Sequence, residues 1–278
     1  MKIFGLTLVK NEQDIIRQSM TAALEWCDRI GVVDNGSTDG TYEIVQELAA
    51  EHPDRFELCG VRDVPFDNDL RRIPFNALRP EAEAGDWWCR LDADEFYPVD
   101  PRSFLQDQVK AHEYVVWSIH LQYYYTDEDY QRWQSGDETL EDRGRPIQKR
   151  RRYYRSDSSE ARFFRHRKRL VWDEDCAWPY HLGPVAKNRI PVQHFLYRDP
   201  EQIKQRLQTR REAFEEGHHR WGENDPDAWK QKIVEASALH YDSHDGDFVI
   251  EEELLPNHLE SLPRRVVKRI FHGIGVWP

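Results

Sequence analysis

The sequence predicts an α/β fold with a mostly parallel sheet, and three observations carry that prediction. In about the first hundred residues, short apolar runs of strand length alternate with segments whose apolar residues recur at helical spacing. The intervening helices are long enough for right-handed crossovers between parallel strands. Polar clusters directly follow three of the runs, at the carboxyl ends of strands, where open parallel sheets bind their ligands.

The expected strands of this first part are short apolar runs at residues 3–9, 30–34, 56–61 and 87–91. The first of them is continuously apolar, as in a strand that helices cover on both faces. Asn11 is a candidate cap for a helix whose apolar positions fall within 15–27. A turn at 35–40 precedes a second helix over 41–51, and residues 68–84 are expected to be helical with a break at a proline.

Beyond residue 100 the pattern is less regular, although several elements are recognisable. The expected elements are a long strand over 114–125, a loop over 126–148, strands over 163–172 and 190–197, helices over 200–217 and 227–239, and an apolar, basic tail from 263. This order predicts one domain over residues 1–200 and a C-terminal helical extension over residues 201–278.

The composition predicts a globular protein of a reducing compartment. Hydrophobic residues make up 39% of the 278 residues, which is enough for a full core. The four cysteines are scattered without a Cys-x-x-Cys pair, so they indicate buried thiols and a cytoplasmic location. Every apolar run is shorter than the ~20 residues that a membrane-spanning helix needs. A formal net charge of −12 opposes a nucleic-acid partner.

Positive charge is nevertheless concentrated in residues 143–170, which hold twelve Lys or Arg and only two acids. This segment could bind a donor diphosphate, a phosphorylated acceptor or an anionic membrane surface. The alternative is a solvated segment whose charges pair with the acidic remainder of the chain. The tail at 264–271 is also basic and apolar, which suits either the inner face of the cell membrane or a helix docked on the core.

An acidic motif, Asp92-Ala93-Asp94-Glu95, ends the fourth expected strand. Two carboxylates at the end of a buried strand are costly to hold without a cation. Oxygen ligands of this kind suit Mg²⁺ or Mn²⁺ and a bound diphosphate. Solvated acids at a strand end are the alternative. The metal site is favoured because the motif falls level with the polar clusters that follow the first two strands.

Three segments together resemble a known family. Leu-Val-Lys-Asn-Glu at 8–12, Val-Val-Asp-Asn-Gly-Ser-Thr-Asp-Gly-Thr at 32–41 and Leu-Asp-Ala-Asp-Glu at 91–95 resemble a family 2 glycosyltransferase of the GT-A type. The resemblance covers about the first hundred residues and is similar to the branch of bacterial polysaccharide and lipopolysaccharide-core enzymes. It implies a Rossmann-like, mostly parallel sheet with helices on both faces. It also implies inverting transfer of a sugar from a nucleotide-diphosphate donor to an acceptor hydroxyl.

The resemblance also assigns roles around the nucleoside. Asp34 would contact the base, and a carboxylate can accept a hydrogen bond from a uracil N–H, so a UDP-sugar is the expected donor. The alternative for Asp34 is a turn-forming acid before Asn-Gly. Lys10, Asn11 and Glu12 would surround the nucleoside, while helix capping alone is the alternative for Asn11.

For the diphosphate, the resemblance places Asp92 at the ribose or the metal and Asp94 on the metal, which would be Mn²⁺ or Mg²⁺. Arg71 and Arg72 resemble a position that contacts the nucleotide, with a solvated helix face as the alternative. His194 resembles a late histidine that adds a metal ligand, although a lone histidine in an apolar run is more often a core residue.

An inverting transfer needs a general base that deprotonates the acceptor hydroxyl. Members of the family carry an acid for this purpose beyond the metal motif, and the acidic cluster at 173–175 is the best match. Asp175 or Glu174 is therefore the expected base, and the two are not separated. An ordinary acidic loop is the alternative.

The expected activity is thus a metal-dependent, hexosyltransferase-like enzyme of bacterial glycan or polysaccharide synthesis, with a glycan or lipid-linked acceptor. One alternative is a sugar-nucleotide nucleotidyltransferase, which would carry a Gly-rich loop where Lys10-Asn11-Glu12 stands. Another is a non-catalytic nucleotide- or sugar-binding scaffold, which would have little need of the acids Asp34, Asp92 and Asp94.

Overall fold

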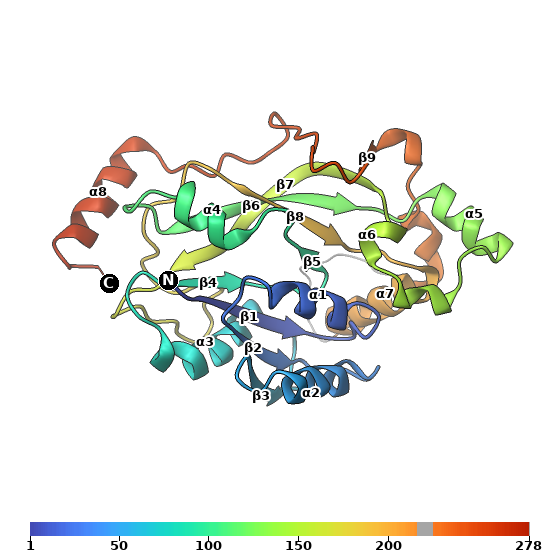
Figure 1. The fold of residues 1–278 in the computed structure, drawn as a ribbon, viewed down its shortest axis with the longest axis horizontal. Coiled ribbons are helices and arrows are strands. Elements are labelled where there is room, and N and C mark those ends of the chain that lie inside the picture. Colours follow the sequence, from blue (N-terminus) through green and yellow to red (C-terminus); the bar gives the residue numbers. More distant parts are fainter. Residues whose placement is uncertain (216–224, 278) are drawn as a thin grey trace.

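One large sheet organises the molecule. The computed structural model describes residues 1–215 and 225–277, and within them nine strands form a single sheet in the order β3-β2-β1-β4-β7-β6-β8-β5, with β9 paired to β7 (Figure 1). Its first half is parallel and consists of β3 (Phe56–Val61), β2 (Arg29–Asp34), β1 (Ile3–Val9) and β4 (Trp87–Arg90). This confirms the predicted α/β class and its parallel strands.

The second half of the sheet has mixed directions. It consists of β7 (Tyr153–Arg165), β6 (Val115–Tyr123), β8 (Ile190–Phe195), β5 (Glu95–Phe96) and β9 (His240–Tyr241). β7 runs antiparallel to both β4 and β6, β8 runs parallel to β6, and β5 runs antiparallel to β8. The β5–β8 pairing joins the end of the acidic motif to a strand about a hundred residues later.

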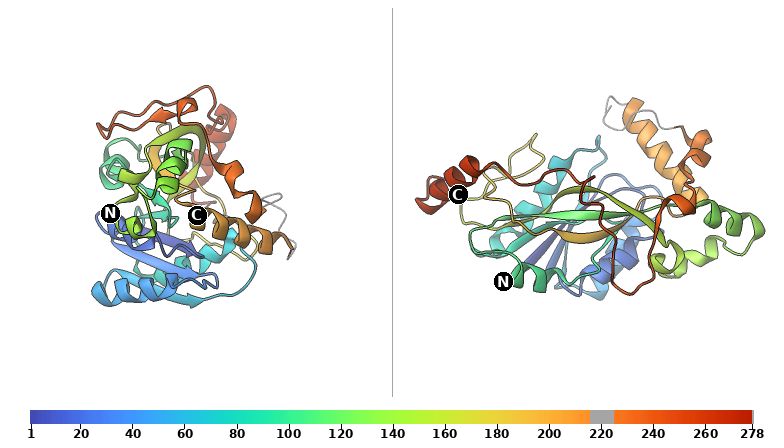
Figure 2. Two further views of the ribbon diagram at one scale, coloured as in Figure 1. Left: turned by 90° about the vertical axis from the view of Figure 1, so that its right-hand side faces the viewer. Right: turned by 90° about the horizontal axis from the view of Figure 1, so that it is seen from above.

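Helices cover both faces of the sheet, as Figure 2 shows from two further directions. The described α-helices are α1 (Ile16–Ala23), α2 (Thr41–Glu51), α3 (Arg72–Leu78), α4 (Pro101–Asp107), α5 (Asp127–Ser135), α6 (Ile147–Arg150), α7 (Pro200–Glu215) and α8 (Leu262–Gly273). Apolar residues of α1, α2 and α4 share one buried cluster, while those of α3 belong to another. α3 packs closely on β2, since a Cβ at Gly31 would lie 2.6 Å from that of Pro74.

The first hundred residues match the predicted elements almost residue for residue, with one correction. Asn11 does not cap a helix, because α1 begins only at Ile16 and has no side-chain cap. Asn11 instead adopts a positive φ of 57° and spans to the turn after β2. Its N–H donates to Ser37 Oγ at 3.0 Å, and its Oδ1 accepts from the Thr38 N–H at 2.8 Å. The break in 68–84 was predicted near Pro74 or Pro80. It occurs at Pro80, in the 3₁₀ turn Arg79–Glu81, whereas Pro74 lies within α3. A second 3₁₀ turn, Asn68–Arg71, precedes α3.

Three predictions for the second half are wrong. Residues 126–148 are not a loop, because a capping box between Thr126 and Asp129 starts α5. Of the strand predicted over 163–172, only residues 163–165 are strand, and they form the end of the long β7. The helix predicted over 227–239 is two 3₁₀ turns, since Val234 exchanges backbone hydrogen bonds with the residues flanking Thr126 and so leaves the helical path.

The C-terminal extension is partly helical and packs on the main body. α7 begins at the predicted residue, while the predicted end at 217 lies outside the described residues. β9 joins the main sheet by pairing with β7, so the domain boundary at residue 200 stays a prediction. Within the described residues, none of the helices has the length and apolar character that crossing a membrane requires.

Candidate functional site

A cavity of about 320 Å³ opens at the carboxyl ends of β1 and β4. Its charged lining within the described residues consists of Lys10, Arg71, Arg90, Arg162, Arg206 and Arg210, with Glu12, Asp92, Asp94, Glu160 and Glu212. His194, Asn11, Asn68 and Thr209 add polar groups. Such a concentration of guanidinium groups beside carboxylates suits an anionic ligand that binds together with a cation.

Three parts of the fold build this cavity. The parallel neighbours β1 and β4 bring residues 10–12 and 92–94 to one edge of the sheet, as the strand order predicted. Pairing of β5 with β8 sets Glu95 opposite His194. Helix α7 then contributes Arg206 and Arg210 from the opposite side of the cavity.

Asp92 is held by two arginines. Its carboxylate accepts a hydrogen bond from Arg71 Nη2 and lies 3.0 Å from Arg162 Nη1. Burial raises the pKa of Asp92, but Arg162 and Arg71 outweigh burial and keep the pKa well below its usual range. Arg71 also donates to Asn68 Oδ1 at 2.8 Å, which fixes its guanidinium at the cavity wall. Arg71 and Asp92, each of which the sequence analysis placed at the donor, are thus in contact.

Asp94 lies between a histidine and two arginines. Its Oδ2 is 3.3 Å from His194 Nε2, 3.1 Å from Arg206 Nη1 and 3.9 Å from Arg198 Nη1. Burial raises the pKa of Asp94, but these cations, His194 first, hold the pKa well below its usual range. Burial likewise lowers the pKa of His194, yet its contact with Asp94 prevails and raises the pKa above 6.5. The predicted metal ligands Asp94 and His194 are therefore in contact.

Glu95, His120 and His194 form a second cluster, which shares His194 with the Asp94 contact. One ligand atom each of Glu95, His120 and His194 lie within 4.8 Å of one another. Glu95 Oε2, His120 Nε2 and His194 Nδ1 are buried without a hydrogen-bond partner. Burial raises the pKa of Glu95 to about 7, although Arg162 opposes this shift. Unpartnered oxygen and imidazole donors next to Asp94 fit a divalent cation, so the residues present suit the metal that the sequence predicted.

Glu12 and Asn11 support the wall formed by α7. Glu12 forms an ion pair with Arg198 and lies 3.4 Å from Arg206 Nη1. Burial raises its pKa to about 7, against the opposing charge of Arg198. Asn11 Nδ2 donates to Thr209 Oγ1 at 3.3 Å, and Lys10 lines the cavity beside them. The Lys-Asn-Glu stretch therefore borders the cavity, as expected, and also anchors a helix that begins 190 residues further along the chain.

Asp34 is completely buried at the end of β2 and does not itself line the cavity. Its Oδ1 accepts the Ser37 N–H at 2.8 Å, which is the turn-forming role. Its Oδ2 is buried without a hydrogen-bond partner. The turn-forming interpretation thus holds for one oxygen, and the other has no hydrogen-bond partner among the described residues.

Arg72, Glu174 and Asp175 lie outside the lining of the cavity. Arg72 Nη2 donates to Glu174 Oε1 at 2.7 Å, and the Glu174 side chain is 75% exposed. Asp175 has a positive φ of 62°, and its N–H donates to Asp69 at 3.3 Å. These contacts tie the acidic loop to the 3₁₀ turn at Asn68–Arg71 and to the first residue of α3, and they leave both candidate bases on the surface.

Several residues of the site escaped the sequence analysis, namely Arg90, Glu160, Arg162, Arg206 and Arg210 in the cavity lining and His120 beside His194. Arg162 is only 1% exposed within the long strand β7, and the strand predicted from 163 missed it by one residue. Arg206 and Arg210 are one helical turn apart in a helix that the sequence did predict. Within the sequence of α7, this spacing of four residues indicates that both arginines lie on the same face of the helix.

Residues 6–73 match the model of a family described as glycosyl transferase family 2. The match includes the Lys-Asn-Glu and Asp-Asn-Gly-Ser segments, while the acidic motif at 92–95 lies beyond it. This segment is therefore that of a family 2 glycosyltransferase, which confirms the resemblance and supports a role in glycosyl transfer. No curated protein matches the chain.

Solved structures of glycosyltransferases share parts of the fold at low similarity. TarS of S. aureus matches 44% of this chain and 22% of its own, at 19% identity and a TM-score of 0.31. The mannosyltransferase PcManGT of Pyrobaculum calidifontis, in complex with GDP-Man and Mn²⁺, matches 85% of this chain and 69% of its own, at 15% identity and a TM-score of 0.39.

Glucosyl-3-phosphoglycerate synthase of Mycobacterium tuberculosis, in complex with Mn²⁺ and UDP, matches 43% of this chain and 44% of its own, at 16% identity and a TM-score of 0.28. This chain therefore aligns with less than half the length of the S. aureus and M. tuberculosis proteins. At these TM-scores, the ligands of the solved structures are not assigned to this chain.

Proposed function

We propose that this chain is an inverting glycosyltransferase that moves a sugar from a nucleotide-diphosphate donor to an acceptor hydroxyl. The observation that carries the proposal is the convergence of Lys10–Glu12, Asp92 and Asp94 on one cavity with five arginines. Two of these features follow adjacent parallel strands, which is where such sheets bind nucleotides. The family match over residues 6–73 supports the same reaction class.

The arginines would bind the donor diphosphate. Arg71, Arg90 and Arg162 surround Asp92, and the Nε atom of each is buried without a hydrogen-bond partner. Each guanidinium therefore has an Nε–H donor that could bind a phosphate oxygen, and arginine binds phosphate in a bidentate manner. Arg206 and Arg210 face them from α7, so the diphosphate would lie between the sheet edge and that helix.

Asp94 and His194 would hold the divalent cation, with Glu95 and His120 behind them and Asp92 at the ribose or the metal. A mixed set of carboxylate and imidazole donors suits Mn²⁺ better than Mg²⁺. When bound, the cation would stabilise the negative charge of the leaving diphosphate.

The donor nucleotide is proposed to be a uridine diphosphate. Asp34 Oδ2 is the buried acceptor without a partner at the end of β2, and the uracil N–H is a suitable donor for it. A buried acceptor that gains its missing hydrogen bond from the ligand adds selectivity for bases that present a donor there.

The general base is proposed to lie either on the exposed loop 173–175 or in the cavity lining. Glu174 or Asp175 stays the proposal from the family resemblance, on the exposed loop beside Arg72. Glu160 is a second candidate because it lines the cavity with a side chain 44% exposed, 3.1 Å from Arg162. Replacing each of the three by its amide and measuring turnover at saturating donor would identify the base as the position with the largest loss.

The setting is proposed to be bacterial glycan or polysaccharide synthesis in the cytoplasm, at the inner face of the cell membrane. The acceptor would then be a glycan or a lipid-linked glycan. This part of the proposal rests on the motifs shared with the bacterial branch of the family and on the basic tail at 264–271.

Calorimetric titration of UDP, GDP, CDP and dTDP in the presence of Mn²⁺ tests the proposed function. We expect UDP to bind, with an affinity that falls when Mn²⁺ is removed. If none of the four diphosphates binds in a metal-dependent way, the proposed function is wrong.

A further inference from the structure

Helix α8 carries an apolar face that the other described residues of the chain leave uncovered. Leu262, Val266, Ile270 and Ile274 follow one another at intervals of four residues, so they form one stripe along the helix. Their side chains are between 52% and 74% exposed. Val267 and Val276 widen the exposed apolar surface. None of the residues of α8 is buried, although a helix docked through its apolar face would bury several.

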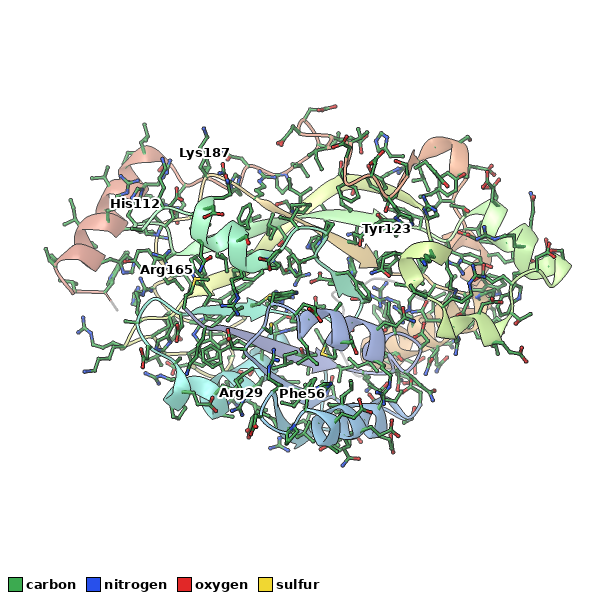
Figure 3. The ribbon with its side chains drawn as sticks, viewed as in Figure 1. Arg29, Phe56, His112, Tyr123, Arg165 and Lys187 are labelled. Atoms are coloured by element: carbon green, nitrogen blue, oxygen red, sulfur yellow. The ribbon has the colours of Figure 1, made fainter. Side chains whose placement is uncertain are left out.

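The polar face of α8 contacts the protein instead. Arg269 hydrogen-bonds to His112, and Lys268 forms an ion pair with Glu260 (Figure 3 labels His112 beside this helix). The His272 ring stacks on Tyr114 with ring centroids 5.5 Å apart. Since an amphipathic helix ordinarily turns its apolar face inward, this orientation is inverted. The alternative of a helix docked on the core by its apolar side is therefore wrong.

We propose that α8 is a membrane-surface helix that lies on an anionic lipid bilayer. Its apolar stripe would enter the boundary between headgroups and acyl chains, and Arg264 and Arg265 would contact acidic headgroups, while Lys268 and Arg269 stay bound to the protein. Residues 262–277 contain Arg264, Arg265, Lys268 and Arg269 and no acid. A short helix with an apolar face and a cationic polar face is the pattern of helices that bind in the plane of the membrane.

The charge distribution favours a bilayer over a second copy of the chain. The whole protein has a net charge of −12, so these four bases are a local exception on an acidic molecule. Packing two α8 helices against each other would bring eight bases together, whereas anionic lipid would neutralise them. The acidic remainder of the protein would then face away from the membrane.

The helix is also far from the proposed donor site. It packs on residues at the amino ends of β4 and β6, while the cavity lies at the carboxyl ends of β1 and β4. Figures 1 and 2 show α8 and α7 at opposite ends of the molecule. Membrane binding through α8 would leave the cavity open and does not depend on the proposed sugar transfer.

Flotation of the full chain with vesicles tests this proposal. We expect binding to vesicles of phosphatidylcholine mixed with phosphatidylglycerol, little binding to phosphatidylcholine alone, and a decrease with added salt. Ile270→Asp should weaken the vesicle partition by about tenfold or more, because it places a charge in the apolar stripe. Arg264→Glu should weaken binding to the anionic vesicles only.

Leu254→Asp is the matched control, because Leu254 is as exposed as Ile270 and lies outside α8. The control should bind vesicles as the unaltered chain does, and thermal unfolding shows whether each variant is folded. Val266→Asp replaces Ile270→Asp if the latter unfolds. The proposal is overturned if the chain does not float with anionic vesicles, or if Ile270→Asp and Leu254→Asp behave alike. It is also overturned if sedimentation shows a dimer that Ile270→Asp dissociates and the vesicles do not bind.

Metal-dependent nucleotide titration in solution is independent of this outcome. A failure of vesicle binding would remove the proposed location at the membrane face but leave the proposed sugar transfer intact, and a failure of nucleotide binding leaves the membrane helix intact.

Discussion

Two groups of buried arginines differ in how completely their nitrogen atoms are satisfied. In the first group, Arg150 and Arg151 both donate to Glu138, with shortest distances of 3.1 and 2.6 Å, and Arg143 pairs with Asp199 at 2.9 Å. The Nε atom of each of these three arginines has a hydrogen-bond partner. This group is a closed network that joins α6, the loop before it and the start of α7.

The second group lines the cavity. Arg71, Arg90, Arg162 and Arg206 also contact carboxylates, but the Nε atom of each is buried without a hydrogen-bond partner. Burying a polar group without a partner is costly, so a protein retains it where a ligand supplies the missing acceptor. The first group is therefore satisfied within the fold. Nε atoms without a partner also occur away from the cavity, as at Arg29 and Arg165, so it is the position of the second group at the cavity that supports the proposed anion site.

The basic segment 143–170 is divided between these two roles. Arg143, Arg150 and Arg151 belong to the closed network. Among the twelve Lys or Arg of the segment, Arg162 is the only one in the described lining of the cavity. Among these four arginines, the anion-binding interpretation therefore concerns Arg162 alone. The alternative was a solvated segment whose charges pair with acidic residues. The pairing is confirmed for all four, while the solvation is wrong for Arg150, Arg151 and Arg162, which are at most 3% exposed.

Breaking the closed network should have the largest effect on folding. Arg151→Met removes a guanidinium that is completely buried and leaves Glu138 without two of its contacts. We expect a loss of about 3–5 kcal/mol in the free energy of unfolding, which urea denaturation measures. Arg145→Met is the control, because Arg145 pairs with Asp142 on the surface and should cost within about 1 kcal/mol. Similar losses in both variants would show that the network stabilises the fold no more than a surface ion pair does.

Asp94→Asn should have the largest effect on turnover. The change retains the size of the side chain but removes the charge that faces His194 and Arg206, so we expect turnover to fall by about 100-fold or more. Thermal unfolding should show that the variant remains folded. Asp173→Asn on the exposed loop is the matched control and should turn over normally. Unchanged turnover of Asp94→Asn would exclude Asp94 from the reaction.

Arg206→Gln should reduce donor affinity without an equal loss of stability. Arg206 faces the cavity from α7, and a charged hydrogen bond to a phosphate is worth about a tenfold change in Kd. Arg211→Gln on the same helix is the control, because Arg211 pairs with Glu215 at the surface. Calorimetry of UDP with Mn²⁺ compares the two, and equal affinities would show that Arg206 does not contact the donor.

The smallest expected effect is a pH dependence of stability at Glu12. Burial raises its pKa from 4.5 to about 7 in the folded protein. Between these values the folded state holds a proton that the unfolded state has released, so this group lowers stability as pH rises through that range. Glu12→Gln mimics the protonated form and should have a flatter profile by denaturation across the same range. A constant difference between variant and unaltered chain would show that Glu12 titrates normally.

The sequence predicted the first half of the fold well because it is a repeating pattern of local signals. Apolar strand runs ending in polar clusters fix both the strands and the edge where residues 10–12 and 92–94 meet. Two of the three predicted clusters, 10–12 and 92–94, meet in the cavity, whereas residues 34–37 are not part of its described lining. The chemical roles of all three stay predictions.

The second half was less predictable because long-range contacts override local patterns. The strand β7 is polar at many positions, and its arginines read as a solvated surface until their buried partners from elsewhere in the chain are known. Arg162 is the clearest case, because its partners Asp92 and Glu95 lie about 70 residues earlier. The face of α7 that closes the cavity likewise depends on Glu12 and Asp94, which no pattern within α7 reveals.

The most direct test of the central claim is calorimetric titration of UDP with and without Mn²⁺ into the unaltered chain, Asp94→Asn and Asp173→Asn. The cavity is predicted to bind UDP together with the cation, so removing Mn²⁺ and replacing Asp94 should each weaken binding, while Asp173→Asn should bind normally. UDP that binds all three proteins equally with and without Mn²⁺, or binds none of them, would contradict the claim that this cavity holds a metal–diphosphate donor.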